Sequence, residues 1–380
     1  MCDFKTFRDI FVVSLKCEKK GITAMLQNVD LRNYLQPTDN QLQRIDSLLS
    51  NCQKFAEDPD NAEPMFLVFT PEDSEFTMPE QLRDPAKMMK TQLDDIKAHL
   101  DIGDDTIPAL RVEFGTGKIA HAYGCEIYEP EDNYPSVKSN VLKKAEDVEN
   151  LVTPGLRDGF FGLIEQYYAF LREHAPDFVR IQLPDLQGPF NNAYLLRGDD
   201  IFLDLYDKPD LVDKLLDKVT DYHISQARQM QEICGEEEGF FCDWNVYWKG
   251  NLRICNCAAH MISTEFYKDF IRKYDQKILD SLGGGRMHYC GTHDKGLLDS
   301  FFTMDKMYGL DFDGTHHDLW EVSAKTPKHI ALSLAISPQQ RERLISGDWP
   351  DKRNIILQIY VSSKAEGIEV LKNLRDSVPK

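Results

Sequence analysis

Residues 263–290 read STEFYKDFIRKYDQKILDSLGGGRMHYC, and this stretch carries the pattern that decides the fold. Apolar residues recur at helical spacing from Phe266 to Leu282, and Ser263 is suited to cap the start of that helix. Three glycines then end the helix, and Arg286–Cys290 follows as a short, mostly apolar run. Such runs are typical of strands that are buried on both faces. The stretch therefore predicts a helix followed by a strand of a parallel sheet.

The same alternation of apolar runs and amphipathic stretches extends along the chain from about residue 65. Most runs are continuous rather than alternating in polarity, as parallel strands are. Eight or nine such strands, separated by helices over roughly 300 residues, predict a (β/α)₈ TIM barrel. The runs are Met65–Phe69, Ala109–Phe114, Phe178–Leu183, Gly239–Trp244, Leu252–Cys255, Arg286–Cys290, Gly309–Phe312, His329–Ile336 and Ile355–Val361.

A doubly wound open sheet is the alternative fold. That fold usually has a glycine-rich phosphate loop after its first strand. Gly115-Thr116-Gly117 is too short for that motif and is followed by Lys118, so we favour the barrel. We assign residues 61–380 to the barrel and residues 1–60 to an N-terminal helical extension that packs over one end of it.

Composition narrows the classes of partner. The 380 residues contain 63 acidic and 44 basic side chains, for a net charge of −19. Because such an acidic surface repels nucleic acid and anionic lipid, we expect neither as a partner. No apolar run approaches the roughly 20 residues that span a bilayer, and residues 1–20 lack the order of a signal peptide. The nine cysteines have no disulfide spacing. We therefore expect a cytoplasmic protein with reduced thiols.

The strand at Arg286–Cys290 carries the candidate chemistry. Side chains of a strand alternate between faces, so His288 and Cys290 project to the same side. Gly291 follows at once and ends the strand, which places the pair at the C-terminal rim, where barrels of this type keep their active sites. An imidazole and a thiolate are two ligands of a zinc site. The alternative is a buried cysteine beside a hydrogen-bonded histidine.

Three further groups end neighbouring runs and are candidates for the same rim. His316 follows the next strand, and Cys255 ends the preceding one and shares a face with Cys257. The predicted metal ligands are therefore His288, Cys290, His316 and Cys255. Asp243 ends a further run and is a candidate catalytic carboxylate; a helix cap or a salt bridge is its structural alternative.

Several motifs, in order, resemble the uroporphyrinogen decarboxylase superfamily over about residues 80 to 375. The resemblance implies a (β/α)₈ barrel. It also implies one of two activities, because the superfamily includes true decarboxylases and zinc-dependent methyltransferases that act on methylated corrinoid proteins. The motifs are Pro184-Asp-Leu-Gln-Gly-Pro-Phe190, Leu195-Leu-Arg-Gly198, Phe202-Leu-Asp-Leu-Tyr-Asp-Lys-Pro209, Ile262-Ser-Thr-Glu-Phe-Tyr267 and His288-Tyr-Cys-Gly291.

The sequence departs from the decarboxylase branch. True decarboxylases resemble one another in an N-terminal Arg-Gln-Ala-Gly-Arg stretch whose arginines hold the substrate carboxylates, and no such stretch is present. Eight carboxylates need several fixed guanidinium groups. Arg111, Arg180 and Arg253 are available, but nothing in the sequence places them together. A tetrapyrrole or small-carboxylate lyase therefore stays the alternative.

The methyltransferase branch is similar at His288 and Cys290, which there bind zinc together with a second cysteine near the last strand. This chain has no cysteine after Cys290, and Tyr360 stands near the expected place. Three outcomes stay open. His316, Cys255 or Cys257 replaces the missing ligand; the metal binds weakly; or the site is metal-free.

The resemblance implies a methyltransferase that moves a methyl group between a corrinoid carrier and a small thiol or methylated substrate, with zinc activation. Asp313 or Asp311 would orient a ligand imidazole. The aromatic residues Trp244, Tyr247 and Trp248 are candidates to cover the barrel mouth. The expected partners are a small-molecule substrate and a corrinoid protein, and a homodimer stays an option. A non-catalytic barrel that binds a tetrapyrrole or corrinoid partner is the third hypothesis.

Overall fold

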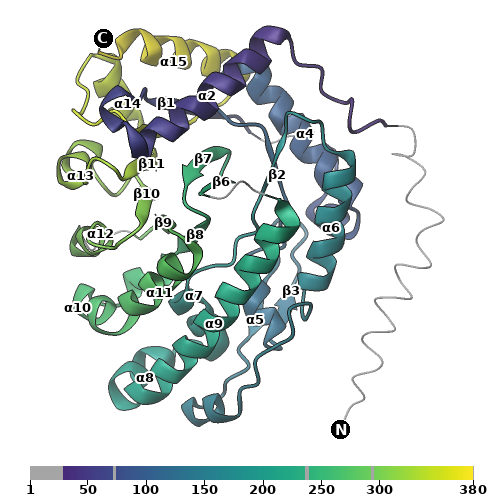
Figure 1. The fold of residues 1–380 in the computed structure, drawn as a ribbon, viewed down its shortest axis with the longest axis vertical. Coiled ribbons are helices and arrows are strands. Elements are labelled where there is room, and N and C mark those ends of the chain that lie inside the picture. Colours follow the sequence, from purple (N-terminus) through teal and green to yellow (C-terminus); the bar gives the residue numbers. More distant parts are fainter. Residues whose placement is uncertain (1–28, 72–73, 236–238, 292–294, 380) are drawn as a thin grey trace.

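Eight parallel strands form the barrel wall in the computed structural model, which describes residues 29–379 except 72–73, 236–238 and 292–294. Six of the strands form one hydrogen-bonded sheet in the order β1-β12-β11-β10-β9-β8, and β2 pairs with β5. Helices surround the ring (Figure 1), so the predicted (β/α)₈ barrel is confirmed. The strands are β1 (Met65–Phe69), β2 (Ala109–Arg111), β5 (Arg180–Gln182), β8 (Leu252–Cys255), β9 (Gly285–Tyr289), β10 (Met307–Asp313), β11 (Ala331–Ala335) and β12 (Ile355–Tyr360).

The helices alternate with the strands and cover the outside of the wall, and a short antiparallel pair, β3 (Glu126–Tyr128) and β4 (Ser136–Ser139), lies among them. Two short 3₁₀ turns, η1 (Pro59–Asn61) and η2 (Ala145–Asn150), lie in the first half of the chain. The helices are α2 (Asp39–Glu57), α3 (Met78–Arg83), α4 (Pro85–Ile102), α5 (Lys118–Ala122), α6 (Phe161–His174), α7 (Pro189–Arg197), α8 (Ile201–Asp207), α9 (Pro209–Cys234), α10 (Thr264–Phe266), α11 (Arg272–Leu282), α12 (Lys295–Phe301), α13 (Leu319–Lys325), α14 (Pro338–Ile345) and α15 (Lys364–Ser377).

The helix expected between Ser263 and Gly283 is present but is interrupted. The Ser263 hydroxyl accepts a hydrogen bond from the Phe266 amide, as a capping residue does. A single π-helical turn, η4 (Tyr267–Ile271), separates α10 from α11. Gly283 ends α11 in the left-handed conformation, with φ of 81°. Such π turns are frequent at functional sites, and this one lies on the chain between the two strands that carry the candidate ligands.

The run at Gly239–Trp244 is not a wall strand, and its prediction as a parallel strand was wrong. Strand β6 (Phe240–Asp243) pairs antiparallel with β7 (Val246–Lys249), and this hairpin lies within the ring in Figure 1. Gly309 of β10 makes room for it, because a Cβ atom there would lie 2.5 Å from the Trp248 ring. The hairpin therefore fills part of the barrel from inside.

Helix α2 contacts β7 and so covers the end of the barrel from which the hairpin enters. Thr38 begins α2 with a capping box, in which its hydroxyl accepts from the Gln41 amide and the Gln41 side chain accepts from the Thr38 amide. The part of the predicted extension that is described, from residue 29, is thus helical over α2. Residues 1–28 lie outside the described residues. Within the described part of the chain, no helix combines the length and apolarity needed to cross a membrane.

Candidate metal centre

The pairing of three neighbouring strands places three of the candidate groups side by side. Cys255 of β8 is opposite His288 of β9, and His288 is opposite Asp311 of β10. All three lie at or near the C-terminal ends of their strands. Their side chains therefore meet at the rim where a barrel of this type carries its chemistry.

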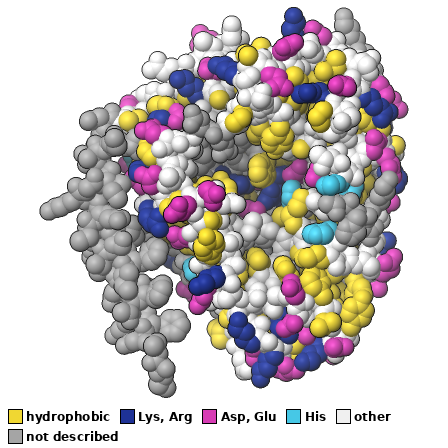
Figure 2. All heavy atoms as spheres, turned by 180° about the vertical axis from the view of Figure 1, so that it is seen from behind, with side chains coloured by type: hydrophobic (Ala, Val, Ile, Leu, Met, Phe, Trp, Pro, Cys, Tyr) yellow, Lys and Arg dark blue, Asp and Glu magenta, His cyan; other side chains and the backbone are white. Residues whose placement is uncertain are grey.

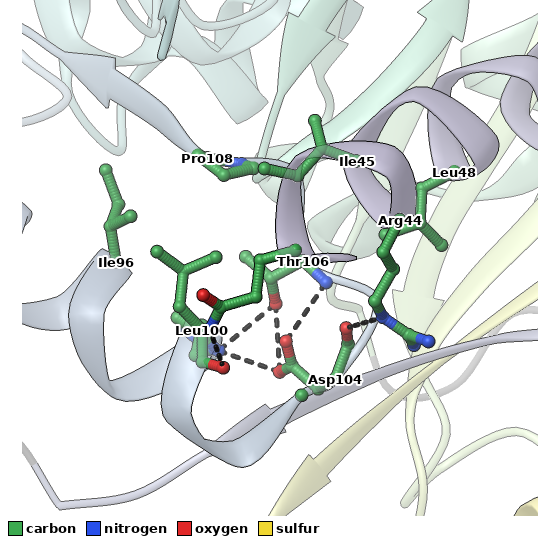
Figure 3. A pocket seen from close by; sticks show the side chains of 11 residues that line it. Arg44, Ile45, Leu48, Ile96, Leu100, Asp104, Thr106 and Pro108 are labelled. Carbon is green, nitrogen blue, oxygen red and sulfur yellow. Dashed lines mark hydrogen bonds and ion pairs between the residues drawn. The ribbon is translucent and has the colours of Figure 1, made fainter. Parts of the chain in front are cut away.

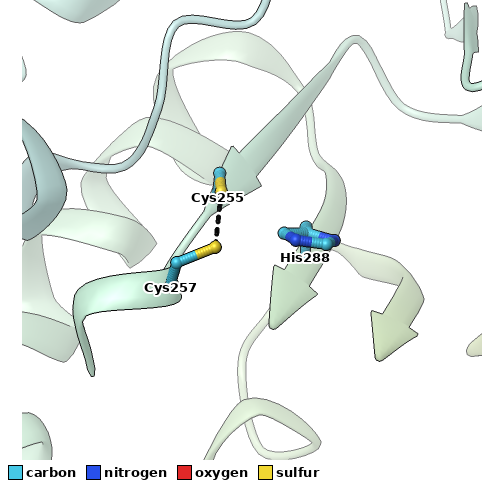
Figure 4. A group of neighbouring side chains, drawn as sticks. All are labelled: Cys255, Cys257 and His288. Atoms are coloured by element: carbon cyan, nitrogen blue, oxygen red, sulfur yellow. Dashed lines mark hydrogen bonds between the residues drawn. The ribbon is translucent and has the colours of Figure 1, made fainter. Parts of the chain in front are cut away.

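Cys257 joins this group from just beyond the strand. The chain leaves β8 through Asn256 into the 3₁₀ turn η3 (Cys257–Met261), which brings the Cys257 sulfur to 3.3 Å from the Cys255 sulfur. Figure 4 shows both thiols beside the His288 ring. One ligand atom from each of these three residues lies within 4.8 Å of the others. Two thiols and an imidazole thus converge with the spacing of a metal site.

Hydrogen bonds of Asn256 fix the turn between the two cysteines. The Asn256 amide donates to the His288 carbonyl at 2.9 Å. The Asn256 side chain donates to the fully buried Asp275 carboxylate at 2.6 Å, and the Tyr267 hydroxyl donates to the same carboxylate at 2.7 Å. Tyr267 belongs to the π turn, so that irregular turn helps to fix the position of the cysteines.

Cys290 lies beside the group but outside it. Its sulfur is 2.8 Å from the Cys257 sulfur, and its side chain is exposed, whereas Cys255 is buried. It follows the last residue of β9. His288 and Cys290 thus lie at one rim of the barrel, and the Cys257 sulfur lies near those of both Cys290 and Cys255.

Asp311 orients the imidazole of His288. The His288 Nδ1 atom is 2.8 Å from the Asp311 carboxylate, so Nε2 is the ring nitrogen that remains for a metal ligand bond. Burial lowers the pKa of His288, but the nearby Asp311 carboxylate outweighs that effect and raises it to about 10. Burial likewise raises the pKa of Asp311, and the His288 charge outweighs it and lowers the value to about 2. The pair is therefore held together electrostatically.

The thiols influence one another's ionisation. The hydrogen bond with Cys257 lowers the pKa of Cys255 to about 7 against the opposing effect of burial. The hydrogen bonds with Cys257 and then His288 lower the pKa of Cys290 to about 4. Cys257, which stands between two thiolates, has its pKa raised. The group is thus predisposed to carry thiolates, the form of cysteine that binds metals and attacks carbon.

The remaining predicted residues lie apart from the cysteines. The Asp243 carboxylate accepts a hydrogen bond from Arg286 Nε at 2.6 Å and is buried, which matches the salt-bridge alternative. Asp313 accepts from the amide and hydroxyl of Thr315. His316 is exposed, 3.7 Å from Asp313, and is not part of the three-residue group. Asp311, rather than Asp313, contacts the imidazole.

The charged side chains inside the barrel are paired with one another. Arg111 is 2.6 Å from Glu113, and Lys118 is 2.8 Å from the same carboxylate. Arg253 is 2.5 Å from Asp185. With the Arg286–Asp243 pair, these three guanidinium groups each have a carboxylate partner, whereas Arg180 of β5 lies over the Tyr247 ring at 4.7 Å. Figure 2 shows a face of the molecule hollowed at its centre, with histidine side chains beside the hollow and charged side chains within it.

A second concave feature lies elsewhere and is too small for a substrate. Figure 3 shows a pocket between α2 and the C-terminal end of α4, lined in part by Arg44, Asp104 and Thr106. Its free volume is about 30 Å³, which is room for about one water molecule. His99 and Thr106 both contact the Asp104 carboxylate there, at 2.7 and 3.0 Å. We assign this pocket to the packing of the helices.

Comparison with known proteins supports the resemblance seen in the sequence. Residues 70–237 match the family model described as uroporphyrinogen decarboxylase (URO-D). The resemblance to the uroporphyrinogen decarboxylase superfamily is thus confirmed over these residues. Two similar curated proteins are called Methylcobamide:CoM methyltransferase MtbA. The one from Methanosarcina acetivorans is 29% identical over 50% of this chain and 53% of its own length. The one from Methanosarcina mazei is 27% identical over 58% of this chain and 60% of its own length.

The aligned part of the chain thus spans little more than half of these relatives. A solved structure of a methyltransferase from Methanosarcina mazei has a TM-score of 0.65 and 19% identity. The match covers 87% of this chain and 97% of that one. At this identity the match bears on the fold alone. The two curated relatives and the solved structure are all named methyltransferases. These names agree with the methyltransferase branch that the sequence favoured.

Proposed function

We propose that the chain is a corrinoid-linked methyltransferase whose reaction takes place at a zinc centre held by Cys255, Cys257 and His288. It would move a methyl group between a corrinoid carrier protein and a small thiol or methylated substrate. The observation that carries the proposal is the convergence of two thiol sulfurs and an imidazole nitrogen within 4.8 Å at the barrel rim. The names of the two curated relatives, both methylcobamide methyltransferases, support the same activity.

The residues present fit zinc. Thiolate and imidazole are the ligands that zinc prefers, and three protein ligands with one open position are typical of catalytic zinc sites. The His288 ring donates through Nδ1 to Asp311, the carboxylate–histidine arrangement that commonly supports a zinc ligand. In this proposal, the cysteines of β8 and η3 stand in for Cys290 and for the missing C-terminal cysteine.

The chain's own residues would perform the positioning. A bound zinc ion would keep a coordinated thiol deprotonated at neutral pH and so supply a nucleophile for methyl transfer. Asp311 holds the imidazole in the orientation that presents Nε2. Asn256, fixed by Asp275, holds the two cysteines at their spacing. Cys290 offers an exposed thiol on the open side, 2.8 Å from the Cys257 sulfur.

The ion pairs inside the barrel argue against the decarboxylase alternative. A substrate with many carboxylates needs guanidinium groups that are free to pair with it. Arg111, Arg253 and Arg286 are instead paired with Glu113, Asp185 and Asp243, respectively. Binding a polycarboxylate would require breaking buried ion pairs, which costs several kcal/mol each.

The test is metal analysis of protein made in zinc-replete cells. We expect about one zinc ion per chain in the wild type and loss of zinc in Cys255→Ser, Cys257→Ser and His288→Ala. Cys234→Ser is the matched control, because this buried thiol hydrogen-bonds to the Gln182 carbonyl away from the group. It should keep the metal.

An activity assay is the second test. We expect the loss of zinc to abolish transfer of the methyl group from methylcobalamin to a small thiol, which the change in corrinoid absorbance measures. Zinc-free wild-type protein would overturn the proposal, and activity that survives in His288→Ala would remove this centre from the mechanism.

A further inference from the structure

The tip of the inner hairpin has a strained backbone. Trp244 and Asn245 both have left-handed φ angles, 48° and 56°. Glycine or asparagine is usual at such a turn, and a bulky residue there is an outlier. Conformations of this kind persist only where the surroundings fix them, and they cluster at functional sites.

Asn245 holds the turn in place from two sides. Its carbonyl accepts a hydrogen bond from the Ile107 amide at 2.8 Å, just before β2. Its side-chain oxygen accepts from the Gln182 side chain of β5 at 2.7 Å. The left-handed pair is therefore bound to the barrel wall, and the position of the Trp244 side chain follows from it.

The turn leaves the Trp244 side chain partly exposed beside two arginines of the barrel wall. Trp244 is 44% exposed, whereas Trp248 of the same hairpin is 3% exposed. The guanidinium carbons of Arg111 and Arg253 lie 5.1 and 5.9 Å from the centre of the Trp244 ring. Arg253 is two residues before Cys255 on the same face of β8, so the ring lies on the same side of the wall as the metal centre.

A second exposed aromatic side chain ends another strand of the wall. Tyr360, at the end of β12, is 62% exposed. It shares a face with Gln358, whose side chain reaches Asp311 at 3.3 Å. The arginines and carboxylates behind these rings are already paired. A ligand that contacts Trp244 would thus meet an indole ring that two guanidinium groups already approach. That arrangement favours a flat, uncharged ring and disfavours a cation.

We propose that Trp244 forms the floor of a binding site for the planar, uncharged aromatic part of a small substrate. That this ligand takes part in methyl transfer rests on the proposed function. Its binding does not, because the contact is made by the indole and not by the metal ligands.

The experiment uses phenol as the probe and the tryptophan fluorescence of the full-length protein as the readout. We expect saturable quenching by phenol, and binding at least about tenfold weaker for cyclohexanol and for phenyltrimethylammonium. Trp244→Leu should weaken phenol binding at least about tenfold, measured by equilibrium dialysis, whereas Trp244→Phe should bind phenol nearly as well as the wild type. Trp320→Phe on α13 is the matched control and should leave both affinity and quenching unchanged.

Thermal unfolding of each variant separates loss of binding from loss of fold, and Trp244→Phe keeps the test valid if Trp244→Leu does not fold. The inference is overturned if phenol does not bind, if cyclohexanol binds equally well, or if a folded Trp244→Leu keeps full affinity. Repeating the titration after chelation distinguishes the two proposals. Phenol binding that survives in zinc-free protein supports the aromatic site even where the metal centre fails its own test.

Discussion

At the scale of single residues, the Asp311 carboxylate decides which nitrogen of His288 faces the cysteines. We expect Asp311→Asn to lower zinc affinity by about 10- to 100-fold, because the variant keeps the hydrogen bond to Nδ1 but loses the charge that supports the ligand. Competition with a chromophoric chelator measures the change. Asp313→Asn, two residues along the same strand, is the matched control and should bind zinc as the wild type does. Equal affinities in both variants would show that Asp311 has no part in supporting the metal.

Asp275 predicts a specific dependence of stability on pH. Burial raises its pKa from 3.8 to about 7 in the folded protein. The folded state therefore holds this proton more tightly than the unfolded state, so the wild type loses stability as the pH rises from about 4 to about 7. Asp275→Asn cannot lose a proton there, and its amide oxygen can still accept from Tyr267 and Asn256. The melting temperature of the variant, relative to that of the wild type, should therefore increase as the pH rises across this range. Parallel profiles for the two proteins would contradict the assignment.

At the scale of elements, the inner hairpin depends on one asparagine. Asn245→Ala removes the acceptor for the Gln182 side chain and puts a residue that tolerates positive φ poorly into the turn. We expect a loss of about 1–3 kcal/mol in the free energy of unfolding, measured in urea. Asn133→Ala serves as control because the Asn133 side chain accepts from the adjacent amide in an exposed loop, away from the hairpin. A loss confined to Asn245→Ala would support the anchoring role, and equal effects would argue against it.

Most elements were predictable from the sequence because each buried strand carries a continuous apolar run followed by a helical period. The exception, residues 239–244, has the same composition as a wall strand, and composition does not show the direction in which a strand is paired. The turn Trp244-Asn245 also lacks the glycine that normally marks a two-residue hairpin. The strands β2 and β5, with three residues each, are shorter than the runs at 109–114 and 178–183 that predicted them.

The site was predictable as far as the alternation of strand side chains extends. His288, Cys290 and Cys255 were identified by their position on or next to strand ends, and the structure brings all three to one rim. Cys257 belongs to a 3₁₀ turn, where that alternation no longer applies, and it was therefore only an alternative ligand. His316 stands beyond the end of β10 in a turn whose direction depends on the Asp313–Thr315 hydrogen bonds. No spacing rule predicts that direction.

At the scale of the whole molecule, three arginines inside the barrel are each paired with a carboxylate of the chain itself. Incubation with uroporphyrinogen should therefore release no carboxylates, since the guanidinium groups that would bind them are paired internally. Mass spectrometry of the tetrapyrrole checks this, and a true decarboxylase assayed in parallel shows that the substrate is competent. Stepwise loss of CO₂ with this protein would revive the lyase alternative.

The closeness of the Cys257 and Cys290 sulfurs has a practical consequence for anyone who handles the protein. At 2.8 Å apart, they need to approach by only about 0.8 Å to reach the length of a sulfur–sulfur bond. In air, metal-free preparations should cross-link these two side chains and lose two hydrogens per molecule to oxygen, and dithiothreitol should restore them. Purification under argon, with zinc present from the first step, should therefore give the more uniform sample.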